Sequence, residues 1–142
     1  MKKIACTALL LALGTAAAFA AAHDDRVAVM RANNGAVMAL RPLVANFDAA
    51  AAKTQGQVLV DNAGKIKAAF APGSDTNDPG AAPAIWTDQA GFNAAADKFG
   101  ADAMKVRDAA DGPGLQAAVM ALQGDCGGCH RTYRITPPRP AQ

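Results

Sequence analysis

The sequence predicts an all-α fold, arranged as an antiparallel four-helix bundle. Four segments carry apolar residues at helical spacing, and stretches of helix-breaking residues separate them. No segment shows the apolar–polar alternation of a strand, and no internal repeat is present. Once an amino-terminal leader is set aside, about 120 residues remain, which is the size of one domain. An antiparallel bundle is the simplest way for four such helices to bury their apolar faces.

The first residues have the features of a secretory leader. Lys2 and Lys3 form a short basic region, and residues 4–19 are apolar and uncharged. A small-x-small cleavage site ends at Ala20, so we expect residues 1–20 to be a signal peptide, cut after Ala20 or, in the same frame, after Ala22. The apolar run is shorter than the ~20 residues that span a bilayer. We therefore expect an exported protein that has no membrane anchor after cleavage.

The first two bundle helices follow the leader. The first is expected from Asp24 to about Leu40, and Pro42 should end or kink it. The second begins after Asp48, which is a good N-cap residue. The apolar stripe of the first helix carries Val27, Met30, Val37 and Met38, and that of the second carries Leu59, Ala63, Ile66 and Phe70.

The last two bundle helices follow a predicted loop. Residues 71–83 are rich in Pro, Gly, Asp and Asn and predict that loop. The third helix opens at Thr87 or Asp88, and a turn over residues 111–114 separates it from the fourth. Their stripes carry Phe92, Ala96, Phe99, Ala103 and Val106, then Leu115, Val119, Leu122, Cys126 and Cys129. We expect the bundle to span residues 21–136 and the proline-rich residues 137–142 to form a disordered tail.

Composition limits the classes of partner. The chain has 14 Lys and Arg against 12 Asp and Glu. Removal of Lys2 and Lys3 leaves 12 against 12, so the mature polypeptide is formally neutral and nucleic acid is not expected as a partner. Aromatic residues make up only 5% of the chain, and many apolar residues are alanines, which bury little area each. Such a core is thin, and a large flat apolar cofactor at its centre would compensate.

The run Cys126-Gly127-Gly128-Cys129-His130 identifies that cofactor. Cys-x-x-Cys-His is the attachment signature of a c-type haem, in which two thiols form thioethers and the histidine ligates iron. On a helix, positions 126, 129 and 130 fall within an arc of roughly 100°, so all three face one macrocycle. A thioredoxin-like dithiol would follow a βαβ pattern, and a zinc site would need ligands beyond His23. The motif predicts one covalent haem c in the core near the carboxyl end.

The chain resembles the class II cytochromes c, which include the cytochromes c′. Their haem motif also lies at the carboxyl end of an all-α chain, and here it continues into Tyr133-Arg134, similar to the family pattern. The run Ile85-Trp86-Thr87-Asp88 is similar to one often found ahead of the third helix. Arg26 followed four residues later by Met30 resembles the pair that places the family's distal residue. The resemblance covers essentially the whole mature chain.

Met30 decides what the resemblance implies for function. If its sulfur ligates iron opposite His130, the protein is a low-spin, periplasmic electron-transfer carrier, and we expect this function. The alternative is a pentacoordinate cytochrome c′ that binds nitric oxide or carbon monoxide at a vacant distal site. Residue type alone favours a core side chain for Met30, and it is the spacing from Arg26 that favours ligation. A competing register, Arg31 with Gly35, would leave the iron open, but the interval from Arg26 to Trp86 fits the family better.

Four further residues are candidates for the haem environment. Arg134 lies one helical turn beyond His130, where it would disfavour an imidazolium and could contact a propionate. Arg26 is a second propionate candidate, and the alternative for both is a solvated arginine. We expect Trp86 and Tyr133 to pack on the haem edge.

The resemblance also bears on assembly and reaction class. It implies periplasmic redox proteins as partners and a possible homodimer through the first two helices. An enzyme is not expected, because the sequence offers no general acid or base over the iron.

Overall fold

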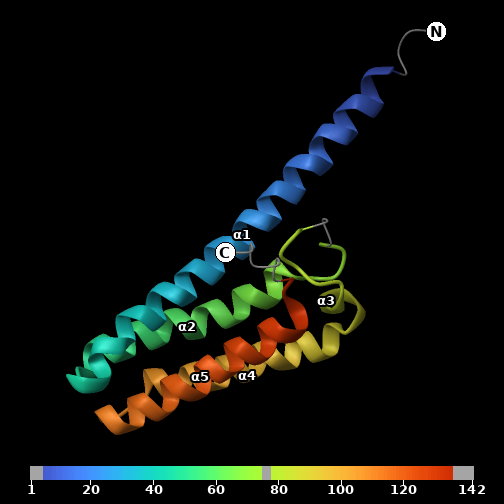
Figure 1. The fold of residues 1–142 in the computed structure, drawn as a ribbon. Helices are drawn as coiled ribbons and strands as arrows, with labels where there is room; N and C mark the ends of the chain where they lie inside the picture. Colours follow the sequence, from blue (N-terminus) through green and yellow to red (C-terminus); the bar gives the residue numbers. More distant parts are fainter. Residues whose placement is uncertain (1–4, 75–77, 136–142) are drawn as a thin grey trace, which may run out of the picture.

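The computed structural model describes residues 5–74 and 78–135, and this part of the chain is helical with one isolated bridge between Ala81 and Arg134. Four long helices run antiparallel to one another, so the predicted bundle is confirmed (Figure 1). A four-residue helix precedes the third long one. The elements are α1 (Ala5–Ala45), α2 (Ala49–Ala69), α3 (Ala84–Thr87), α4 (Gln89–Arg107) and α5 (Gly112–Tyr133).

Aspartates start three of the four long helices. The carboxylates of Asp48, Asp88 and Asp111 accept hydrogen bonds from the amides three residues ahead, at 3.0, 3.1 and 2.7 Å. Each carboxylate thereby satisfies a backbone donor that has no partner inside the helix. The starts of α2 and α4 agree with the sequence. The turn expected over residues 111–114 is wrong, because Asp111 already caps α5 and Pro113 lies in its first turn, where proline is tolerated.

Helix α1 is longer at both ends than the sequence predicts. It continues past Pro42 to Ala45, so the prediction that Pro42 ends the helix is wrong. Proline has no N–H to donate to the carbonyl four residues before it, but the helix resumes because the Asn46 amide bonds the Pro42 carbonyl at 3.1 Å. Toward the amino terminus it runs unbroken from Ala5 through the expected start at Asp24. Its first half projects beyond the other helices and contains residues 5–20 of the predicted leader (Figure 1). Cleavage after Ala20 or Ala22 stays a prediction. Within the described residues, we find no helix with both the length and the apolar character needed to cross a membrane.

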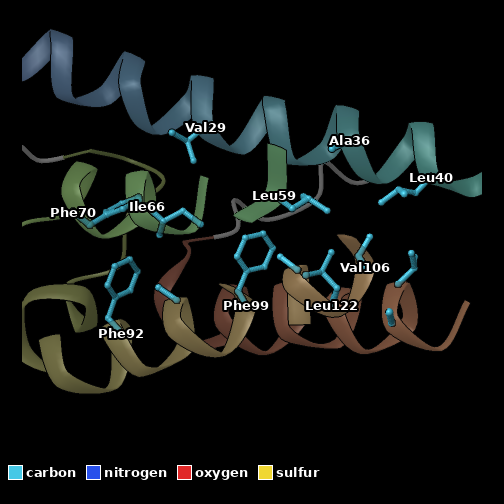
Figure 2. Packing of buried hydrophobic residues seen from close by; sticks show 14 of the residues in the cluster. Val29, Ala36, Leu40, Leu59, Ile66, Phe70, Phe92, Phe99, Val106 and Leu122 are labelled. Carbon is cyan, nitrogen blue, oxygen red and sulfur yellow. The ribbon is translucent and has the colours of Figure 1, made fainter. Parts of the chain in front are cut away.

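The core lies along the bundle axis, where large side chains of all four long helices meet (Figure 2). The predicted stripes of α2, α4 and α5 are buried or partly buried. In α1 the helical phase differs, and the inner face carries Val29, Ala36 and Leu40. Met38, which lies on the predicted stripe of α1, is 49% exposed, so its expected place in the core is wrong. The tail over residues 137–142 lies outside the described residues.

The bundle is least closely packed between its first and last helices. Helix α2 packs extensively on α1 and on α4, and α4 packs extensively on α5. The contact between α1 and α5 is sparser than these three. We call this boundary between α1 and α5 the seam. At one end of the seam lie the carboxyl end of α5, the loop residues 71–74 and 78–83, and α3 (Figure 1).

Candidate functional site

The haem motif lies in the last turns of α5. Cys126, Cys129 and His130 are half-buried, and the helix continues without a break to Tyr133. Both cysteines pack against the hydrophobic core, and neither forms a disulfide. The structure therefore presents two thiols and an imidazole on adjacent positions of one rigid element.

The surroundings keep all three groups in their neutral forms. Burial raises the pKa of the Cys126 thiol, and the neighbouring Asp125 carboxylate adds to the effect. Burial likewise raises the pKa of the Cys129 thiol, with a contribution from Cys126. Burial lowers the pKa of His130, and the positive charge of Arg134 lowers it further. A neutral imidazole has a free nitrogen lone pair, which is the form that ligates a metal.

Arg26 is buried, with 3% of its surface exposed, and holds the loop between α2 and α3. Its Nε donates to the Ala69 carbonyl at 2.9 Å. Its Nη2 donates to the carbonyl and the hydroxyl of Ser74 at 2.5 and 3.0 Å, and its Nη1 donates to Asp78 Oδ2 at 3.2 Å. The predicted propionate candidate is thus directed at protein acceptors, and an exposed arginine is wrong for this position.

Met30 lies one turn beyond Arg26 on α1. It is half-buried and packs against the core. In the competing register, Arg31 and Gly35 are both exposed, and a Cβ added at Gly35 would meet nothing within 4 Å. The structure thus turns the Arg26 and Met30 pair toward the interior and the other pair toward solvent.

A row of aromatic rings joins Arg26 to the end of α5. The Arg26 guanidinium lies 4.7 Å from the centre of the Phe70 ring. Phe70 and Phe92 are 5.2 Å apart, and Phe92 meets Tyr133 edge-on at 5.3 Å. The Tyr133 hydroxyl donates to Asp88 Oδ2 at 2.9 Å, and this carboxylate raises the pKa of Tyr133. The site is therefore tied together across all four long helices.

Trp86 lies on the other side of Arg26, with the guanidinium 5.5 Å from its ring centre. The residue is half-buried, and its indole Nε1 is buried without a hydrogen-bond partner in the described part of the chain. An unsatisfied buried donor is costly. This N–H is therefore available to an acceptor outside the described residues.

Sequence reasoning missed two groups at this site. His23, to which it gave no role, lies with Nδ1 3.0 Å from Asp78 Oδ2. Asp78 itself lay unremarked in the predicted loop. Burial opposes the charge on Asp78, but hydrogen bonds from Gly80, His23 and Arg26 outweigh it and lower the pKa of this carboxyl. No local pattern could have revealed them, because their partners are 52 and 55 residues away in the chain.

The donor set fits a covalently attached haem. Two free thiols and an imidazole supply the covalent attachments and the iron ligand of such a group. The unsatisfied indole donor and the sparsely packed seam fit a further group beside them. Sequence analysis named the three motif residues together with Trp86, Tyr133 and Arg134, and their roles toward a haem stay predictions. The structure brings Arg134 near His130 and Trp86 near Arg26.

Comparisons with known proteins agree with this geometry. A family model described as Cytochrome C′ matches residues 21–134. The chain is 42% identical to cytochrome c-556 of Agrobacterium tumefaciens over 71% of its own length and 84% of that protein. It is also 42% identical to cytochrome c′ of Rubrivivax gelatinosus, over 70% and 81%.

Solved structures give the same result. A nitric oxide complex of a variant of cytochrome c prime from Alcaligenes xylosoxidans superimposes with a TM-score of 0.73 at 29% identity. The alignment covers 81% of this chain and 94% of that one.

Proposed function

The chain belongs to the cytochrome c′ family, and we propose that it is a periplasmic haem protein that binds nitric oxide or carbon monoxide at an open distal position. The family carries one covalently attached haem c. We assign its two thioethers to Cys126 and Cys129 and its proximal ligand to His130. The observation that carries the proposal is that these three residues are half-buried on one helix, with both cysteines packed against the core.

The residues around the motif have separate roles in this proposal. Burial lowers the pKa of the His130 imidazole, and Arg134 lowers it further because a second positive charge nearby would be unfavourable. Trp86 offers its unsatisfied N–H to a haem propionate. Tyr133 packs on the haem edge, and its bond to Asp88 holds the last turn of α5 in place. When bound, the haem would supply one-electron redox chemistry and the capacity to bind a diatomic gas.

The His/Met-ligated electron carrier expected from the sequence is not confirmed. The relatives favour the alternative, since the nitric oxide complex among the solved structures is of a protein named cytochrome c prime. One observation keeps the carrier as a second candidate. Met30 is half-buried against the core, on the inward side of α1, and thioether sulfur is an established haem ligand.

Absorption spectra of the purified ferric and ferrous protein, with and without carbon monoxide, separate the two candidates. An open distal position predicts high-spin ferric haem and a ferrous spectrum that changes when carbon monoxide is added. Low-spin ferric haem with a methionine-to-iron charge-transfer band, and a ferrous form that takes up little carbon monoxide, would instead support the electron carrier.

We also propose that two copies pair through the faces of α1 and α2. Alanines from both helices line a shallow groove between them, flanked by Asp25 and Lys65. Small side chains allow helices of two subunits to approach closely. Sedimentation equilibrium of the haem-loaded protein should give twice the mass of one chain, and a monomer at all accessible concentrations would contradict the dimer.

A further inference from the structure

The two sides of the predicted haem site belong to different helices. Met30, on the distal side, lies on α1, and His130, on the proximal side, lies on α5. These two helices pack on each other only sparsely. The residues that span the seam at this end of the bundle are 78–82, which we call the loop bridge.

The loop bridge is bonded to α1 through a buried ion pair. Arg26 Nη1 donates to Asp78 Oδ2 at 3.2 Å, and the two side chains are 3% and 6% exposed. His23 Nδ1 lies 3.0 Å from the same oxygen. Because Arg26 is one turn before Met30, this pair fixes the loop bridge to the part of α1 that carries the distal residue.

The other carboxylate oxygen of Asp78 connects to α5. Asp78 Oδ1 accepts from the Gly80 amide at 2.8 Å, which shapes the turn. The Gly80 carbonyl accepts from the Ile135 amide at 3.1 Å, and the Ala82 amide donates to the Tyr133 carbonyl at 3.1 Å. These bonds hold the chain immediately after His130. Asp78 therefore bonds α1 directly, through Arg26, and is linked to the residues after His130 indirectly, through Gly80.

We infer that Asp78 is a positioning residue that sets the separation of α1 from α5 around the haem and so controls how readily a gas reaches the distal side. This inference rests on the proposed function. Direct packing across the seam is weak, so the bridge supplies the restraint that packing supplies elsewhere in the bundle. Loss of the carboxylate breaks the buried ion pair between Asp78 and Arg26, and breaking a buried pair from one side is unfavourable. Helix α1 then moves away from α5.

The test uses the haem-loaded protein and Asp78→Asn, with Asp97→Asn as a matched control. Asp97 pairs with Lys67 between α2 and α4, on the surface and away from the seam. Carbon monoxide association with the ferrous protein is measured by flash photolysis, and amide hydrogen exchange is followed at Gly80, Ala82 and Ile135. We expect association about three- to tenfold faster in Asp78→Asn, faster exchange at the three amides, and no change in the control. Asp78→Glu, which keeps the carboxylate, should recover much of the wild-type rate.

The outcomes separate the inference from the proposed function. Unchanged association in Asp78→Asn, or unchanged exchange at the three amides, would overturn the positioning role. A wild-type protein that takes up no carbon monoxide contradicts the proposed function instead. In that case the spin state of the ferric haem tests the positioning role of Asp78. A larger high-spin fraction in Asp78→Asn than in wild type and Asp97→Asn supports the inference, and equal fractions refute it.

Discussion

His130 and its two neighbouring cysteines show how single side chains prepare the site. Burial keeps the imidazole and both thiols uncharged, and Arg134 and Asp125 act in the same direction on His130 and Cys126. These pKa shifts favour the thiol and neutral-imidazole forms, and a neutral imidazole is the form that ligates a metal. The three groups lie close together because they are neighbours on one helix, and no contact with a distant segment is needed to bring them together.

The cysteines give the first prediction at this scale. Haem should remain on the denatured wild-type chain through acid–acetone extraction, and the mass should exceed that of the polypeptide by one haem. Cys126→Ser and Cys129→Ser should each retain haem through one thioether, and the double variant should lose it on extraction. Haem that is extracted from the wild-type protein would contradict the assignment of both cysteines.

Met30 gives the second prediction. If the distal position is open, Met30→Ala leaves the ferric haem high-spin and speeds carbon monoxide association, because a side chain has been removed from the distal side. Met38→Ala is the matched control, since Met38 lies on the same helix and is 49% exposed. It should change neither property. A conversion of wild-type low-spin haem to high-spin in Met30→Ala would show that the sulfur was the ligand.

Asp78 gives a prediction about pH. Its pKa is lower in the folded protein than the ordinary 3.8. Its contribution to the free energy of unfolding is therefore fully present above the ordinary carboxyl pKa and is lost as the pH falls through the folded-state pKa. Denaturant unfolding of wild type and Asp78→Asn should differ at about pH 6, and the difference should shrink toward about pH 3. A difference that grows on acidification would contradict the assignment.

At the scale of helices, periodicity and capping determine most of the fold. Asp48 and Asp88 start helices where the sequence predicts them, and the stripes of α2, α4 and α5 enter the core. The phase of α1 could not be read in the same way, because Asn33 interrupts its inner face and bonds the buried Asn62 at 2.9 Å. Met38 was misplaced for this reason.

In the candidate site, too, features that are local in sequence could be predicted and contacts between distant segments could not. The motif on α5 is local in sequence and was found from spacing alone. The contacts of Arg26 with Asp78 and of Tyr133 with Asp88 join residues 52 and 45 positions apart. Such pairs depend on how the helices pack, and no periodicity of a single segment encodes them.

Two glycines of α2 test the packing of helices. A Cβ at Gly56 would lie under 3.0 Å from the backbone of Arg107 on α4, whereas a Cβ at Gly64 would meet nothing within 4 Å. Gly56→Ala should force α2 and α4 apart and destabilise the protein by about 1–3 kcal/mol. Gly64→Ala should stabilise it by about 0.5–1 kcal/mol, because alanine is the better helix former. Chemical denaturation measures both, and equal effects would show that the two helices do not cross closely.

At the scale of the whole molecule, the bundle leaves one of its four boundaries weakly packed. The alanine-rich composition predicts a thin core, and in the structure the core is thinnest where α1 and α5 contact each other only sparsely. The haem motif, Met30 and the loop bridge all lie on the elements that border or cross this seam. A flat apolar group placed there would complete the burial that the side chains of α1 and α5 leave unfinished.

A crystal structure of the haem-loaded ferric protein tests the central claim most directly, through the distance between the iron and the sulfur of Met30. We predict haem bonded to Cys126, Cys129 and the His130 imidazole, with the Met30 sulfur outside bonding distance and the distal position open to a gas. A sulfur bonded to iron opposite His130 would contradict the account and make the protein a low-spin electron carrier.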